Sequence, residues 1–89
     1  MLFHLTNRTR SDLSAAQYGE LATLAKTFYA SMPADVKIRG EWAADDRSSN
    51  YTLLEAPDID TVRRIQAPFA DYTDTVIVAV TAITGWAAG

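Results

Sequence analysis

The stretch Thr75-Val-Ile-Val-Ala-Val-Thr-Ala-Ile83 decides the fold, because its apolar side chains stand at odd and even positions alike. A strand of this composition has two faces that must both be kept from water. The chain as a whole predicts the order β-α-β-β-α-β, and two helices can cover only one face of a four-stranded sheet. We therefore expect a second copy of the chain to cover the other face and close a two-chain barrel with a small cavity between the layers.

The composition is that of a small acidic protein. Its 89 residues contain 8 Lys and Arg against 11 Asp and Glu, a formal net charge of −3, which argues against nucleic acid as a partner. Cysteine is absent and histidine occurs once, so we expect no disulfide and no metal. Gly-rich phosphate loops are absent too, and we expect no cofactor. No apolar stretch approaches the roughly 20 residues that a membrane span requires. We expect no membrane partner and a cytoplasmic protein.

The first half of the chain predicts a strand, then a helix. Residues 1–7 alternate as a strand does. Ser14 and Gln17 have capping-box spacing, so a helix should begin near Ala15, and Pro33 should end it. Apolar side chains recur along this helix every three to four residues, which predicts one buried stripe. The stripe consists of Tyr18, Leu21, Ala22, Ala25, Phe28, Tyr29 and Met32.

The second half predicts a hairpin, a helix and the last strand. Residues 36–43 and 50–56 are strand-like and are joined by a polar turn at 44–49. Asp58 should cap the second helix, and Pro68 should break or kink its end. With right-handed crossovers this order gives an α+β, ferredoxin-like antiparallel sheet whose first and third strands are central. We expect one domain over residues 1–84 and a short tail over 85–89.

Alternation along the strands sorts their side chains into two faces. The purely apolar members should face the helices, and these are Phe3, Leu5, Ile38 and Leu54. The opposite face should then mix apolar and ionisable side chains, namely Leu2, His4, Thr6, Arg39, Glu41, Tyr51, Leu53 and Glu55. Gly40 leaves an alternative open, because glycine inside a strand often marks a bulge that reverses the alternation. Trp42 would then replace Glu41 on this face.

Once enclosed, such a mixed face would suit a small molecule. His4 is a candidate acid or base, with Glu55 or Glu41 as its partner. The structural alternative is a half-buried histidine, with glutamates that pair with Arg39 across the sheet. Tyr51 and Trp42 are candidate walls for a flat ligand, or ordinary cross-strand packing. Arg39, Thr6 and Leu53 complete the candidate binding residues, and Asp45-Asp46 is typical of a solvated turn rather than a metal site.

Two segments resemble muconolactone isomerase. They are Met1-Leu2-Phe3-His4 and Asn50-Tyr51-Thr52, the latter followed by Ala56-Pro57-Asp58. Residues 41–56 also resemble uncharacterised bacterial members of the same dimeric α/β-barrel superfamily. The resemblance implies paired sheets, each with a cavity used for isomerisation, cyclisation or cofactor-free oxygenation of small, often unsaturated or aromatic molecules. The matching positions are Phe3, His4, Asn50 and Tyr51.

From the residues and this resemblance we predict a cofactor-independent enzyme of catabolic or secondary metabolism that moves a proton within its cavity, as an isomerase or cyclase does. Its partners would be its own copies, as a homodimer or larger even oligomer, and a small unsaturated or aromatic metabolite. A cofactor-free monooxygenase using the same cavity is one alternative. A non-catalytic metabolite-binding or oligomerisation module is another.

Overall fold

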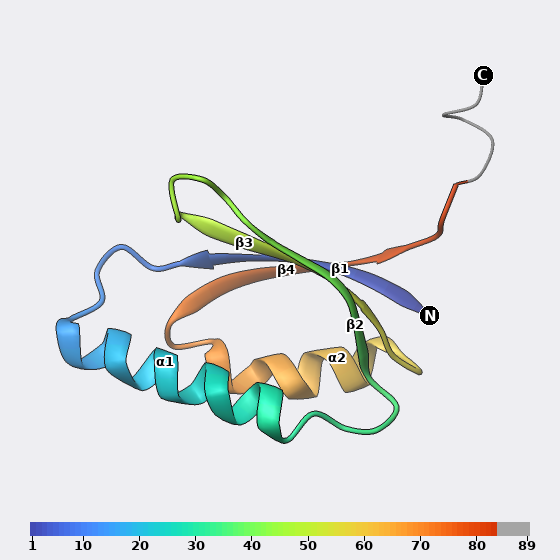
Figure 1. The fold of residues 1–89 in the computed structure, drawn as a ribbon, viewed down its shortest axis with the longest axis horizontal. Helices are drawn as coiled ribbons and strands as arrows, with labels where there is room; N and C mark the ends of the chain where they lie inside the picture. The colour runs from blue at the N-terminus through green and yellow to red at the C-terminus, as the bar shows by residue number, and fades with distance from the viewer. Residues whose placement is uncertain (84–89) are drawn as a thin grey trace.

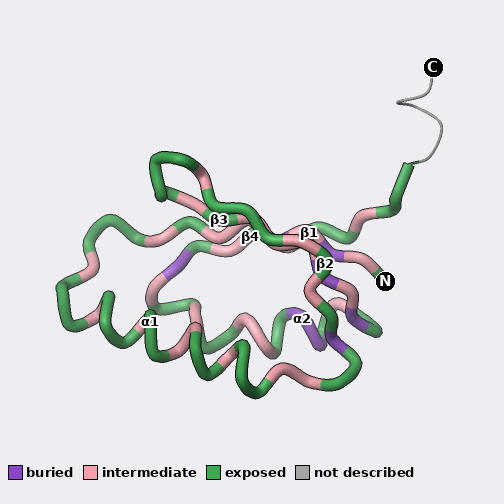
Figure 2. The backbone as a smooth tube through the Cα atoms, viewed as in Figure 1, coloured by how far each residue is buried: buried purple, intermediate pink, exposed green. Residues whose placement is uncertain are grey.

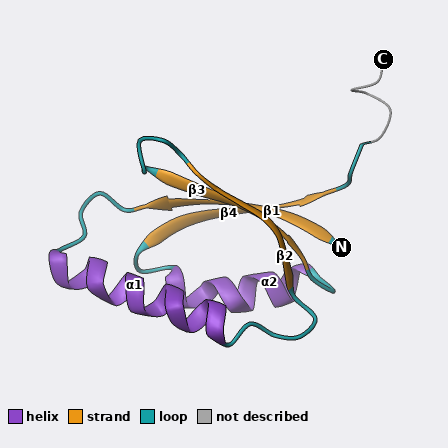
Figure 3. Cartoon of the chain, in the orientation of Figure 1, coloured by secondary structure: helices purple, strands orange, loops and turns teal. Residues whose placement is uncertain are grey.

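The computed structural model describes residues 1–83, and both of its helices lie on one side of a single antiparallel sheet (Figures 1 and 3). The elements are β1 (Leu2–Thr9), α1 (Ala15–Ala30), β2 (Lys37–Ala43), β3 (Ser49–Glu55), α2 (Ile59–Gln66), η1 (Ala67–Phe69) and β4 (Thr73–Val80). The sheet order β2-β3-β1-β4 puts β1 and β3 at the centre. The predicted ferredoxin-like fold is therefore confirmed. The tail predicted for 85–89 lies outside the described residues.

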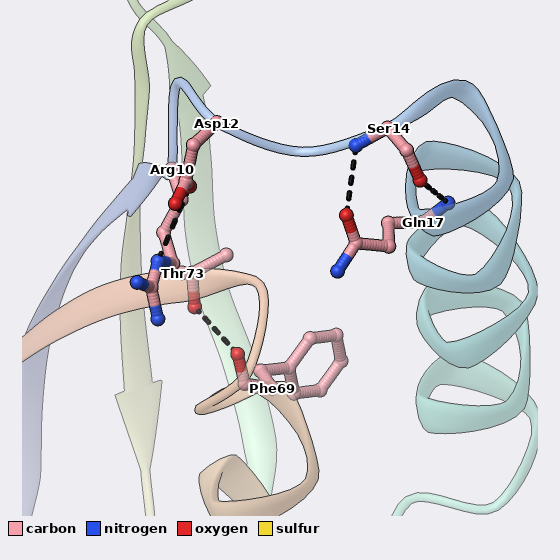
Figure 4. Close-up of polar contacts among 6 residues, drawn as sticks. All are labelled: Arg10, Asp12, Ser14, Gln17, Phe69 and Thr73. Atoms are coloured by element: carbon pink, nitrogen blue, oxygen red, sulfur yellow. Dashed lines mark hydrogen bonds and ion pairs between the residues drawn. The ribbon is translucent and has the colours of Figure 1, made fainter.

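Both helices start where their capping residues predict. At α1, the Gln17 backbone N–H donates to Ser14 Oγ at 3.2 Å, and the Ser14 N–H donates to Gln17 Oε1 at 2.8 Å (Figure 4). At α2, Asp58 Oδ1 accepts hydrogen bonds from the backbone N–H and the hydroxyl of Thr61, both at 2.7 Å. These two hydrogen bonds lower the pKa of Asp58 below its usual value. Each cap satisfies backbone donors that the helix itself leaves unpaired.

The helix ends differ in part from the prediction. Helix α1 already ends at Ala30, where the Ser31 N–H donates to the Thr27 carbonyl, before Pro33 is reached. Pro68 falls within the 3₁₀ turn η1, which follows α2 directly. The Thr73 hydroxyl donates to the Phe69 carbonyl at 3.2 Å and so ties this turn to the start of β4 (Figure 4).

The hydrophobic core lies between α2 and the sheet. Its buried side chains are Phe3, Leu5, Val36, Leu54, Ala56 and Val62. Phe3, Leu5 and Leu54 were expected there, and each is completely buried. Burying a side chain of this size contributes roughly 1.5–3 kcal/mol, so these few residues hold α2 on the sheet.

Helix α1 does not form the buried stripe that its periodicity predicts. It contains no buried residue, and Figure 2 shows it in the colours of exposed and intermediate positions only. Tyr18 and Tyr29 are 48% and 56% exposed. The prediction was wrong because periodicity tells which side chains share a face, not how closely that face approaches a neighbour.

The side of the sheet opposite α1 and α2 is called the open face, and it is formed by the strand side chains that point away from these two helices. On β4, Ile77 lies opposite Leu5 on the helix side, whereas Val76 and Val78 lie opposite Thr6 and His4. These two valines are 59% and 49% exposed. The expected bare apolar face is thus present, while its coverage by a second copy stays a prediction. Strand β4 is shifted from the stretch 75–83, since it begins at Thr73 and ends at Val80.

Candidate functional site

A bulge in β2 decides which side chains reach which face. Ile38 pairs with Leu54 but Gly40 pairs with Leu53, which leaves Arg39 as the extra residue. The alternation is reversed from Gly40 onward. Glu41, opposite Thr52, therefore lies on the helix side, and its expected place on the open face is wrong. The alternative, in which a bulge puts Trp42 on the open face in place of Glu41, is correct.

Trp42 occupies the open face opposite Tyr51, as the bulge requires. Its indole lies over Gly40, because a Cβ at that glycine would stand only 2.6 Å from Trp42 Cη2. Trp42 as a whole nevertheless stays 58% exposed.

The open face brings together seven of the eight candidate residues. The rings of His4 and Tyr51 stack with centroids 6.2 Å apart and an interplanar angle of 27°. Arg39 Nη2 lies 2.9 Å from Glu55 Oε2. Leu53 is opposite His4 and Thr6 is opposite Tyr51 in the ladder between β1 and β3. The remaining candidate, Glu41, lies on the other side of the sheet.

The helix side of the sheet holds a cleft that the sequence analysis did not place. This α1–sheet cleft has a volume of about 440 Å³. Its lining residues are Asn7, Thr9, Leu21, Ala25, Phe28, Tyr29, Glu41, Trp42, Ala43, Asn50, Tyr51, Thr52, Gln66, Phe69 and Thr73. Two of them, Trp42 and Tyr51, belong to the open face as well. It exists because α1 stands off this half of the sheet, whereas α2 packs closely on the other half.

A signal for the cleft was present in the sequence. The alternation that puts Phe3 and Leu5 on the helix side continues to Asn7, and the one through Leu54 continues to Thr52 and Asn50. Polar side chains at helix-facing positions predict a site that is either solvated or filled by a ligand, because burying them without partners is costly. Tyr29 carried no comparable signal, since it was expected in the buried stripe of its helix, and nothing in the sequence singled out Gln66.

Tyr29 and Glu41 form the central polar contact of the cleft. The Tyr29 hydroxyl donates to Glu41 Oε1 at 2.7 Å. Partial burial, this hydrogen bond and the negative charge of Glu41 together raise the pKa of Tyr29 to about 12. The phenol is therefore neutral at physiological pH and held as a hydrogen-bond donor beside a carboxylate.

The rest of the cleft joins an aromatic wall to neutral polar groups. Phe28 and Phe69 meet edge to face with ring centroids 5.6 Å apart. On the sheet, Asn7 Oδ1 accepts a hydrogen bond from the Thr75 hydroxyl at 2.7 Å, which fixes the orientation of its amide. A flat molecule placed here would contact rings on one side and amides on the other.

Within residues 1–83, no three His, Cys, Asp or Glu side chains gather as a metal site. Asp46 serves the hairpin turn instead, since its Oδ1 accepts from the Ser48 backbone at 3.0 Å and from the Ser48 hydroxyl at 2.6 Å. These bonds lower the pKa of Asp46. In the same range, neither helix has the length and apolar character needed to cross a membrane.

Comparison with known proteins places the fold and the family. The crystal structure of muconolactone isomerase is similar, with a TM-score of 0.67 and 20% sequence identity over 94% of this chain and 92% of that chain. At this identity the likeness shows a shared fold. The structure of Rv0793 from Mycobacterium tuberculosis is 10% identical over 94% of this chain and 98% of that chain, with a TM-score of 0.47. No curated protein matches. The family described as a domain of unknown function (DUF3303) matches residues 1–88, and the chain belongs to that family.

Proposed function

We propose that this protein is a cofactor-independent enzyme that moves a proton on a small molecule bound in the α1–sheet cleft, in an isomerase or cyclase type of reaction. The observation that carries the proposal is the Tyr29–Glu41 hydrogen bond on the wall of a cleft of about 440 Å³. A carboxylate base beside a neutral phenol is a pair suited to general acid–base work. The fold shared with an isomerase supports the reaction type by analogy only.

The proposed chemistry needs no redox partner. Glu41 removes a proton from a carbon next to a carbonyl group, the double bond shifts, and the same carboxyl group returns the proton to a second carbon. The Tyr29 hydroxyl turns from Glu41 to the substrate oxygen and stabilises the negative charge that develops there. Atoms and electrons balance, because the proton lost at one carbon is regained at another.

Cyclohex-3-en-1-one is a suitable probe, because its rearrangement to the conjugated enone is followed by ultraviolet absorbance. We expect the protein to accelerate this reaction and Glu41→Gln to lose at least about a hundredfold of the rate, the range of a general base. Tyr29→Phe should also lose about a hundredfold of the rate, the low end of what one hydrogen-bond donor to a developing oxyanion contributes.

A second tyrosine–glutamate pair provides the matched control. The Tyr72 hydroxyl donates to Glu20 Oε2 at 2.9 Å, and neither residue lines the cleft. Glu20→Gln and Tyr72→Phe repeat the same chemical changes there and should leave the rate unaltered. A Glu41→Gln variant as fast as the unmodified protein would overturn the proposal.

The open face is the second candidate for the same chemistry. The stacking of His4 on Tyr51 and the ion pair of Arg39 with Glu55 favour it. Here His4 would carry the proton, Glu55 would assist, and Tyr51, Trp42, Arg39, Thr6 and Leu53 would bind the substrate. Loss of activity in His4→Gln together with full activity in Glu41→Gln would select this site.

We also infer that the protein forms a homodimer or larger even oligomer through the open face and works in the cytoplasm. The support for association is the exposure of Val76 and Val78 on a face that neither α1 nor α2 covers. A second copy would enclose the open-face candidate and leave the α1–sheet cleft on the far side of each sheet.

A further inference from the structure

The charge on the lining of the α1–sheet cleft is only negative. Among its lining residues in the described chain, Glu41 is the only carboxylate and none is Lys, Arg or His. The other polar groups are the amides of Asn7, Asn50 and Gln66 together with hydroxyls. A ligand in this cleft therefore meets one negative charge and otherwise neutral donors and acceptors.

Several cationic side chains are held elsewhere by their own partners. Arg39 pairs with Glu55 at 2.9 Å, Arg10 with Asp12 at 3.5 Å (Figure 4), and Arg63 with Asp60 at 3.7 Å. None of these three arginines lines the cleft. A carboxylate ligand would thus lose water and gain a like charge in Glu41, with no cation on the lining to offset either cost.

The neutral groups fit an uncharged ligand better. The side-chain amides of Asn50 and Gln66 make no hydrogen bond to another described residue, so both can donate to and accept from a bound molecule. Phe28 and Phe69 offer a wall of two rings at 80° to one another. An aromatic or conjugated ring can pack against such a wall.

We propose that the cleft selects uncharged planar molecules that carry hydroxyl, carbonyl or amide groups, and that Glu41 excludes carboxylates of the same shape. This inference rests on the proposed function, because it assigns the substrate class of the same cleft. The negative charge of Glu41 then has two effects, as base and as a repulsive element against anionic competitors.

The test compares 4-hydroxybenzamide with 4-hydroxybenzoate, which share ring, hydroxyl and outline and differ in charge. Binding to the full ¹⁵N-labelled chain is followed by nuclear magnetic resonance at the side-chain amide signals. The chain has four such amides, of which Asn7, Asn50 and Gln66 line the cleft. The fourth, Gln17, belongs to the α1 capping box and serves as an internal control.

We expect 4-hydroxybenzamide to shift the three cleft amides in a saturable way and leave Gln17 unmoved, with 4-hydroxybenzoate at least tenfold weaker. Glu41→Gln should strengthen binding of 4-hydroxybenzoate about tenfold, whereas Glu20→Gln should not. The same spectra show whether each variant is folded.

Equal binding of the two probes, or a Glu41→Gln variant that still rejects the benzoate, would overturn the inference. The absence of any shift with either probe would overturn it as well. The proposed function is judged separately, by the enone rate of Glu41→Gln, so the two failures are distinguishable.

Discussion

At the scale of single residues, the Tyr29–Glu41 pair makes the free energy of unfolding decrease at alkaline pH. The pKa of Tyr29 is about 12 in the folded chain against an ordinary value of 10.0. Because the folded value is the higher one, the stabilisation is fully present below pH 10 and is lost as the pH rises from 10 to 12. We expect the urea midpoint of the unmodified protein to fall across this window more than that of Tyr29→Phe, as followed by circular dichroism.

The same pair gives a spectroscopic check. An absorbance titration at 295 nm should show one tyrosine ionising near pH 12 that is missing from Tyr29→Phe. In Glu41→Gln the pKa of Tyr29 should fall toward 10, because charge repulsion is removed and only burial and a weaker acceptor remain. If the ionisation that Tyr29→Phe lacks lies near pH 10 instead, the pair does not form.

At the scale of elements, the bulge in β2 is followed by a close contact between Gly40 and the indole of Trp42. Gly40 needs no left-handed backbone conformation, so its lack of a side chain serves the indole, which would stand 2.6 Å from a Cβ. We expect Gly40→Ala to displace the indole and cost about 1 kcal/mol of unfolding free energy, the low end for overpacking. Urea unfolding measures the cost, and near-ultraviolet circular dichroism reports the indole.

Making Gly40→Ala in the Trp42→Ala variant tests whether the cost comes from the indole or from alanine itself at position 40. In Trp42→Ala the obstacle is gone, and Gly40→Ala should then stabilise by about 0.4–1 kcal/mol, because alanine restricts the unfolded chain. The sign of the substitution therefore reverses between the two backgrounds. If Gly40→Ala costs the same in both, the indole does not lie over the glycine.

Some features of the helices and strands could be predicted from the sequence, and others could not. Capping residues such as Ser14 and Asp58 act within one turn, so both helix starts were predictable. The bare face followed from counting helices against strands. The position of Glu41 was not fixed, since a bulge at Gly40 was possible but its occurrence depends on cross-strand packing. The cleft was missed, because the distance between α1 and the sheet is a tertiary property that side-chain periodicity does not contain.

At the scale of the whole molecule, the two sides of the sheet differ in how they are covered. On one side α2 closes the core while α1 leaves a cleft. On the other side, Val76 and Val78 are exposed and neither α1 nor α2 covers them. An 89-residue chain buries only about two thirds of the surface that its unfolded form exposes, so association through the open face would supply stability that one chain lacks.

Val78→Asp tests that association, since it places a charge at the middle of the open face, opposite His4. We expect the unmodified protein to have at least twice the 9.8 kDa mass of one chain in light scattering coupled to size exclusion, and Val78→Asp to run as a monomer. Ala22→Asp adds the same charge on exposed helix α1 and should leave the assembly intact. Circular dichroism of each variant separates loss of association from loss of folding. A monomeric unmodified protein, or a Val78→Asp variant that still associates, would show that the open face meets solvent rather than a second copy. The proposed enclosure of the His4 site by that copy would then be wrong.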